Sequence, residues 1–471
     1  MSKQRMARRE FLVRLPAIPV GISAVLGTLG RAAAQPVTAP SSAVEAGPVV
    51  RAAFLRPPGK YWMGWPGAFY DVDGHQQEWT RLIAEAGQTL GVHVTMNQRP
   101  LQDDAQVADF ITKTKAHPPE AVLLTLLHMN QWGQVNKIVE AGLPTIIFSP
   151  IGMAFTGHFS ELSRRPKVYL VSSMDFGAVK YGLKMVRAAY QMANARVVLV
   201  AGNERADSVT PNLGTKVRRI PRKRFLDEYN SIGDTAEVKQ IADERIARAQ
   251  AVREPTRKDV ENAARTYIAT KRILETEQGD AITMDCLGLV GERLMPTPPC
   301  MGWQMVNDEG LTAGCEGDMD ACLSLMLVRR LFDRPGFMQD PVPEWPANRF
   351  LGAHCTCATR LDGFDKPPAP YILRHHSESD IGVAIQTLWR VGQPITIARL
   401  TGPESMLIYT GTVAGNMDTP PAGGCRTDVI VEMKNLPDAR DIQGFHQVLF
   451  YGDFERELRC YCQMYNIKQA T

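Results

Sequence analysis

Short apolar runs alternate with longer amphipathic runs from residue 49 onward. The short runs have the length of strands, and the longer runs repeat apolar positions every three or four residues, as helices do. In the first part of the chain the predicted strands are 49–55, 92–98, 121–125 and 144–148, and the predicted helices are 74–90, 103–117 and 130–141. Glycine follows several of these helices at the position of a C-cap. This order predicts a parallel sheet covered by helices.

The same alternation begins again after residue 165. It predicts strands at 168–171, 195–201 and 281–285, and helices at 175–192, 235–251 and 257–276. The pattern then changes to short β-like runs separated by Gly and Pro, at 349–356, 371–375, 394–400, 404–413, 429–433 and 447–452. We therefore predict an α/β fold class, with two Rossmann-like parallel-sheet domains, 49–165 and 166–345, and a β-rich C-terminal domain, 346–471.

The first 34 residues have the pattern of an export signal. Arg8-Arg9-Glu10-Phe11-Leu12 matches the core of a twin-arginine signal, and a mildly apolar stretch at 15–29 follows it. Pro and Gly interrupt that stretch, so it does not predict a stable membrane anchor. We expect the twin-arginine translocase to export the protein to the periplasm, with signal cleavage after residue 34 and a flexible tether at 35–48. An uncleaved amphipathic anchor is the alternative interpretation.

Composition and charge limit the classes of protein to which the chain can belong. Of the 471 residues, 44% are apolar and 22% are charged, which is typical of a well-cored globular chain. Without residues 1–34, the chain carries 47 basic and 49 acidic side chains, so nothing in its charge favours nucleic-acid binding. No nucleotide-binding glycine motif opens a helix. The nine cysteines are predicted to be isolated thiols, with a Cys300–Cys315 disulfide as the alternative.

Residues of the types that ligate hard metal ions are spread over the second half of the chain. Glu316 ends the apolar run 311–315. Asp318 and Asp320 follow it at the start of a predicted helix, where simple capping explains both. Asp340, His354 and His446 are the other candidates. A Glu/Asp/His metal site is one interpretation of this set, and helix caps with satisfied core histidines are the other.

Two loops that follow predicted strands carry candidate sugar-binding side chains. Trp62, Trp65 and Tyr70 follow the first strand, and His128 follows the third. Aromatic faces stack on sugars, and loops at strand ends line clefts. Trp65 and His128 are therefore predicted to contact a sugar, with core packing or an oligomer contact as the alternative.

Six short segments resemble a known enzyme family. They are 213–217 (LGTKV), 254–260 (EPTRKDV), 285–288 (DCLG), 315–318 (CEGD), 337–340 (FMQD) and 352–355 (GAHC). From residue 49 to the C-terminus the chain resembles the L-fucose isomerase and L-arabinose isomerase superfamily of metal-dependent aldose–ketose isomerases. The two α/β domains and β-rich C-terminal domain of that family agree with the periodicity described above.

The resemblance implies one Mn²⁺ (or Mg²⁺) per active site, held by Glu316, Asp340 and His446. The two carboxylates would also act as the catalytic acid/base pair, and the domain 166–345 would carry both of them. His354 would either ligate the metal or donate a hydrogen bond to a sugar hydroxyl. The implied reaction converts an aldose to a ketose through a cis-enediol, with a small-molecule sugar as substrate and a homo-oligomer as the expected assembly.

An export signal is unusual for this family, whose familiar members are cytoplasmic. The alternative function is therefore a non-catalytic periplasmic carbohydrate-binding protein that retains the isomerase fold, because a fold does not by itself imply an activity. Retention of Glu316, Asp340 and His446 favours the isomerase.

Overall fold

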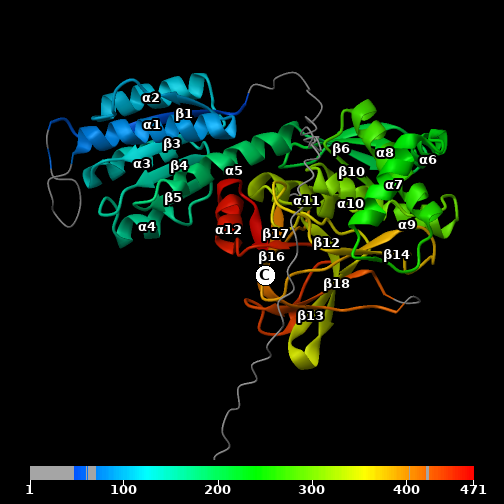
Figure 1. The fold of residues 1–471 in the computed structure, drawn as a ribbon. Coiled ribbons are helices and arrows are strands. Elements are labelled where there is room, and N and C mark those ends of the chain that lie inside the picture. Colours follow the sequence, from blue (N-terminus) through cyan, green and yellow to red (C-terminus); the bar gives the residue numbers. More distant parts are fainter. Residues whose placement is uncertain (1–46, 60, 62–70, 403, 421–423, 471) are drawn as a thin grey trace, which may run out of the picture. The chain divides into compact units, whose positions relative to one another are not determined.

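The computed structural model describes residues 47–59, 61, 71–402, 404–420 and 424–470. The predicted export signal, most of the predicted tether and Trp65 lie outside these residues. The described chain is a mixed α/β structure with two mainly parallel sheets and an antiparallel, barrel-like C-terminal region (Figure 1). None of its helices is long and apolar enough to cross a membrane.

The first sheet contains five parallel strands in the order β2-β1-β3-β4-β5. The strands are β1 (Val49–Leu55), β2 (His93–Met96), β3 (Ala121–Leu126), β4 (Thr145–Ser149) and β5 (Val168–Ser172). The helices that accompany them are α1 (Val72–Leu90), α2 (Asp104–Ala116), α3 (Trp132–Val139), α4 (Thr156–Leu162) and α5 (Gly177–Asn194). All residues of β3 and β4 are buried, as expected for strands covered on both faces. The elements predicted here by periodicity are confirmed to within a few residues.

One strand joins a different sheet from the one predicted. The run at 168–171 was expected to open the second α/β unit, but β5 pairs with β4 at the edge of the first sheet. That placement is wrong because a five-residue apolar run indicates a strand without indicating its partner. The C-terminal helix α12 (Glu455–Met464) packs beside this edge, where the Gln463 side chain donates to the carbonyl oxygen of Val168.

The second sheet has the order β11-β10-β6-β8-β7, in which only β7 is antiparallel to its neighbour. Its strands are β6 (Arg196–Val200), β7 (Ala206–Val209), β8 (Lys216–Ile220), β10 (Ala281–Met284) and β11 (Thr312–Gly314). Its helices are α6 (Arg222–Ser231), α7 (Ala236–Arg248), α8 (Arg257–Glu277), α9 (Cys286–Gly291), α10 (Cys300–Asp308) and α11 (Met319–Phe332). A capping box between Thr256 and Asp259 begins α8, the longest of them.

The C-terminal region is a seven-stranded sheet in the order β16-β19-β12-β13-β18-β17-β20. Its strands are β12 (Phe337–Glu344), β13 (Arg349–His354), β16 (Pro394–Leu400), β17 (Ser405–Asn416), β18 (Thr427–Met433), β19 (Gln447–Tyr451) and β20 (Lys468–Ala470). Because β16 also pairs with β17, six of these strands form a closed ring around a separate apolar core. A small sheet beside it contains β9 (Ala251–Val252), β14 (Tyr371–Arg374) and β15 (Ala384–Thr387).

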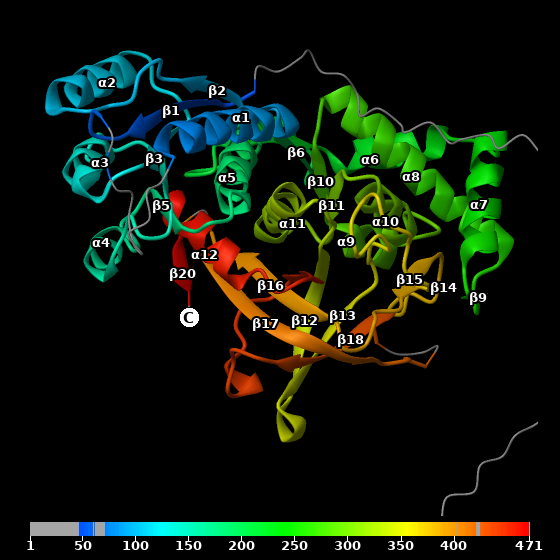
Figure 2. The same cartoon turned by 60° about the vertical axis from the view of Figure 1, so that its left-hand side comes forward.

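The barrel-like region begins earlier than the pattern predicted. β12 pairs with β13 and β19, so Asp340 belongs to this region and not to the second α/β sheet. The helix α11 packs against β10 and β11 on one side and against β16 on the other, as Figures 1 and 2 show. Its first turn therefore lies where the second sheet meets the barrel. The Rossmann-like description and the domain boundaries stay predictions.

Candidate metal centre

Glu316 and His446 both occupy turns in the left-handed backbone region. Glu316 follows β11 with φ 60°, and Gly317 after it has φ 70°. His446 precedes β19 with φ 52°. Non-glycine residues adopt this conformation at a cost in energy, and such residues gather at functional sites. The turns direct both side chains towards the start of α11.

Sheet register brings the other two candidates to the same place. Gln339 pairs with Gln447 across β12 and β19, which sets Asp340 opposite His446. Asp340 in turn pairs with Ala353, the residue before His354 on β13. Asp340 and His354 therefore come from the adjacent strands β12 and β13, His446 comes from the turn before β19, and Glu316 reaches them from the turn after β11.

Three of the side chains, Glu316, His354 and His446, converge on one small volume, and Asp340 contacts His446 beside it. The Nε2 atom of His446 lies 3.3 Å from Oε2 of Glu316 and 3.4 Å from Oδ1 of Asp340. The Nε2 atom of His354 lies 3.4 Å from Oε1 of Glu316. Donor atoms of Glu316, His354 and His446 all lie within 4.8 Å of one another. Both imidazoles are buried, whereas the two carboxylates retain about a quarter of their exposure, 25% and 26%.

Burial and mutual electrostatic interactions together shift the pKa values of all four groups. The imidazoles of His354 and His446 hold the pKa of Glu316 well below its usual range, against the effect of burial. Burial raises the pKa of Asp340, although the two histidines oppose the shift. Burial would lower the pKa of His446, but Asp318 and Glu316 raise it to about 9. The pKa of His354 is also raised, because Glu316 and Asp340 outweigh burial.

The donor set fits a hard divalent cation. Two carboxylates and two imidazoles are ligands that Mn²⁺ accepts, and adjacent ligands around such an ion lie about 3 Å apart. Oδ1 of Asp340 and Nε2 of His446 are buried, and neither has a well-aligned hydrogen bond in the described structure, although they face each other at 3.4 Å. Buried polar atoms are normally satisfied, so this pair is explained by a group that both would bind.

Sequence reasoning missed one carboxylate and one arginine beside this cluster. Asp318 was assigned to capping, and it is indeed the N-cap of α11, where Oδ1 accepts from the Ala321 amide at 2.9 Å. Its other oxygen, Oδ2, lies 3.0 Å from Nδ1 of His446 and 3.0 Å from the guanidinium of Arg399. No local signal reveals this contact, because His446 is 128 residues away in sequence.

His128 lies elsewhere. It stands after β3 and caps the short 3-10 helix Met129–Gln131, with its Nδ1 accepting from the Asn130 amide at 3.2 Å and its ring edge-on to Tyr61. It is not a member of the cluster around Glu316. Its role in sugar binding stays a prediction, as does that of Trp65. Cys300 and Cys315 are both free, so the predicted alternative of a disulfide between them is wrong.

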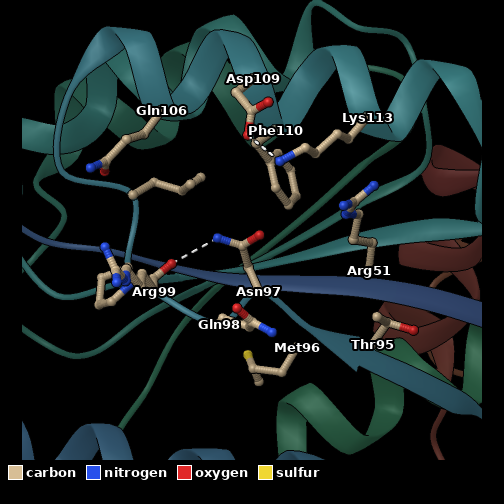
Figure 3. Close-up of a pocket in the computed structure, with 12 residues that line it drawn as sticks. Arg51, Thr95, Met96, Asn97, Gln98, Arg99, Gln106, Asp109, Phe110 and Lys113 are labelled. Carbon is tan, nitrogen blue, oxygen red and sulfur yellow. Dashed lines mark hydrogen bonds and ion pairs between the residues drawn. The ribbon is translucent and has the colours of Figure 1, made fainter.

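A cavity of about 590 Å³ lies against β1, β2 and α2, away from these residues (Figure 3). Arg51 packs over the Phe110 ring inside it, and Lys113 forms an ion pair with Asp109 at 2.7 Å. None of the candidate site residues that the structure describes lines this cavity. The cavity and the cluster around Glu316 are therefore separate features of the described structure.

The chain has limited similarity to characterised proteins. No family model matches it. It is 25% identical over 208 residues to a sulfoquinovose isomerase from Clostridium sp. (strain MSTE9), a match that covers 40% of this chain and 45% of that enzyme. The chain thus matches less than half the length of this curated relative. A sugar-binding protein of a sugar ABC transporter from Bacillus halodurans is 15% identical over 72% of this chain and 97% of its own, with a TM-score of 0.16, which is too low to carry an argument.

Proposed function

We propose that this protein is an exported, divalent-metal-dependent aldose–ketose isomerase that acts on a sugar through a cis-enediol. The observation that carries the proposal is the convergence of Glu316, Asp340 and His446 from a parallel sheet and two barrel strands. A protein that only bound sugar would have no need of two half-buried carboxylates and two buried imidazoles around one point. The similarity to an enzyme named a sugar isomerase supports the same reaction class.

Glu316, Asp340 and His446 would hold the metal, with His354 as a fourth ligand or as a donor to a sugar hydroxyl. A bound Mn²⁺ or Mg²⁺ supplies a Lewis acid that polarises the carbonyl oxygen and the neighbouring hydroxyl oxygen of the sugar. Glu316 stays ionised next to two imidazoles, which suits a permanent anionic ligand. Burial raises the pKa of Asp340, so this carboxylate takes up a proton more readily than Glu316 does and is the better proton acceptor of the two.

The proton balance of the reaction needs only these groups and water. A carboxylate takes the proton from C2 of the aldose, and the C1–C2 enediol forms as the carbonyl oxygen gains a proton from a second donor, His354 or a water molecule. The carboxylic acid then returns a proton to C1, while the C2 hydroxyl gives its proton back to that second donor and becomes the ketone. Substrate and product have the same composition, so no redox partner is required. Acid–base help of this kind contributes roughly 10²–10⁴-fold to the rate.

The test uses the purified wild-type protein. Elemental analysis should find about one Mn²⁺ or Mg²⁺ per chain. A ketose assay should then find turnover with a member of an aldose panel that includes sulfoquinovose, the sugar named for the relative. Bound metal without turnover, together with saturable sugar binding, would favour the carbohydrate-binding alternative. Absence of stoichiometric metal after reconstitution would contradict the metal site itself.

We also propose that residues 1–34 direct the folded protein through the twin-arginine translocase to the periplasm. The paired arginines are the feature that the translocase recognises, so changing both Arg8 and Arg9 to Lys should retain the protein in the cytoplasm. Cell fractionation measures this directly. Undiminished export of the double variant would contradict the twin-arginine route and leave the proposed reaction unaffected.

A further inference from the structure

We infer that Asp318 is a positioning residue that fixes His446 as a metal ligand, an inference that rests on the proposed metal-dependent function. The two carboxylate oxygens of Asp318 make different contacts. Oδ1 accepts from the Ala321 amide and begins α11. Oδ2 faces Nδ1 of His446 at 3.0 Å, and this contact lies on the side of the imidazole away from Glu316 and Asp340.

The contact decides which nitrogen of His446 is left to coordinate. Both oxygens of Asp318 face groups that can only donate, the Ala321 amide at Oδ1 and the Arg399 guanidinium at Oδ2, so the carboxylate acts as a hydrogen-bond acceptor. Nδ1 must therefore be the donor. The lone pair available to a cation is then on Nε2, the atom that faces Glu316 and Asp340. A carboxylate behind a ligating histidine fixes its tautomer and ring orientation and makes it a better ligand.

Arg399 holds this arrangement in place from β16. One of its Nη atoms contacts Oδ2 of Asp318 at 3.0 Å, and the other donates to the backbone carbonyl of His446 at 3.0 Å. Gly444, with φ 83°, lies against this side chain, and a Cβ there would come within 3.1 Å of Cδ of Arg399 and 2.7 Å of Leu407. A glycine at position 444 therefore leaves room for the Arg399 side chain beside the turn that precedes His446.

His354 provides an internal contrast. Its Nε2 faces Glu316 at 3.4 Å, but its buried Nδ1 has no hydrogen-bond partner among the described residues. Its ring lacks the carboxylate support that His446 has. We therefore assign His446 as the strongly oriented nitrogen ligand of the pair.

The experiment compares three variants by Mn²⁺ titration, with electron paramagnetic resonance of the free ion as the readout. Asp318→Asn preserves the N-cap, because Asn caps helices as well as Asp, but it removes the anionic acceptor. Asp318→Ser also preserves a cap and is too short to reach His446. Both should weaken Mn²⁺ binding by roughly 10–100-fold. Asp320→Asn, two residues later in the same first turn, should leave the affinity unchanged.

A double-mutant cycle separates positioning from general damage to the fold. If Asp318 acts through His446, then Asp318→Asn should have no further effect on Mn²⁺ affinity in a His446→Gln background. Nitrogen coupling in the spectrum of bound Mn²⁺ should weaken in Asp318→Asn, which a purely structural role for the aspartate would not predict. Thermal unfolding of each variant checks that the fold is retained.

The outcomes distinguish this inference from the proposed function. Wild-type protein that binds no Mn²⁺ would overturn the proposed function and this inference with it. Wild-type binding with an unchanged affinity in Asp318→Asn would overturn only the role of Asp318. An equal loss from Asp318→Asn with and without His446 would also overturn it, because the aspartate would then act by another route.

Discussion

The two parallel sheets of this protein are built from the same alternation of strand and helix, yet among the described residues a cluster of possible metal ligands is found only at the end of the second sheet. In the first sheet, His128 follows β3 and makes its polar contact with its own turn. In the second, Glu316 follows β11 and meets histidines from the barrel. The two sheets differ in what packs against the ends of their strands. The chain passes from β11 through α11 directly into β12, and this short connection brings the antiparallel strands against the sheet edge.

The largest expected effect is at the end of β11. Glu316→Gln preserves size and one oxygen but removes the negative charge that two imidazoles stabilise. We expect loss of most bound Mn²⁺ and of nearly all isomerisation, a loss of roughly 10²–10⁴-fold or more in kcat/KM, with the fold intact. Elemental analysis and the ketose assay measure both.

Asp320→Asn is the matched control for that variant. Asp320 lies in the first turn of α11, where its Oδ2 accepts from the Gly402 amide at 2.9 Å, and an Asn oxygen can still accept there. The change should cost a few tenths of a kcal/mol of dipole interaction and leave turnover near wild type. Wild-type metal content and activity in Glu316→Gln would instead remove the isomerase proposal.

A smaller effect is expected for a change at Asp340 on β12, where metal binding should weaken but the metal-free protein should become more stable. Asp340 is half-buried near the charge of Glu316, and both effects disfavour its own charge in the metal-free protein. Asp340→Asn should weaken Mn²⁺ binding by about 10–100-fold while raising the free energy of unfolding of the metal-free protein by about 0.5–1 kcal/mol at pH 7. Titration calorimetry and urea unfolding would measure the two changes. If the metal-free variant were less stable than metal-free wild type, the Asp340 carboxylate would not destabilise the metal-free fold, and its assignment as a ligand that does so would be contradicted.

A third expectation concerns Asp428, one strand beyond His354. Burial raises the pKa of Asp428 to about 7, and its Oδ2 has no hydrogen-bond partner in the described structure. A folded-state pKa above the unfolded value means that the folded state binds the proton more tightly. The contribution to stability is therefore present at pH 4 and is lost as the pH rises towards about 7.

Asp428→Asn should not lose stability in this way as the pH rises, because the Asn side chain does not ionise. At pH 8 the variant should be more stable than wild type by about 1–3 kcal/mol, and at about pH 3.5, where the carboxyl is protonated in both the folded and the unfolded state, the two should be nearly equal. Urea unfolding at both pH values measures the difference. If wild type and Asp428→Asn were equally stable at pH 8, the ionised Asp428 carboxylate would not destabilise the folded protein.

Local patterns predicted the elements well and the long-range contacts poorly. The strands β1 and β3 and the helix α8 follow from periodicity and capping residues, which are local properties. The partner of β5 is not local, so that strand was placed in the wrong sheet. Asp318 shows the same limit within one side chain. Its capping oxygen was predictable from the turn that it begins, but the oxygen that faces His446 depends on how the barrel packs against α11.

The smallest expected effect returns to the first sheet. His128→Asn removes the imidazole but leaves a short polar acceptor at the N-cap, so the turn at Met129–Gln131 should be retained. If the two sheet edges differ as the geometry indicates, Mn²⁺ affinity should be unchanged and kcat should stay within about three-fold of wild type, with any loss confined to KM for the sugar. Steady-state kinetics and the Mn²⁺ titration test this. A fall in kcat of a hundred-fold with normal metal binding would break the comparison. It would mean that the first sheet supplies a group to the reacting sugar in addition to the groups around Glu316.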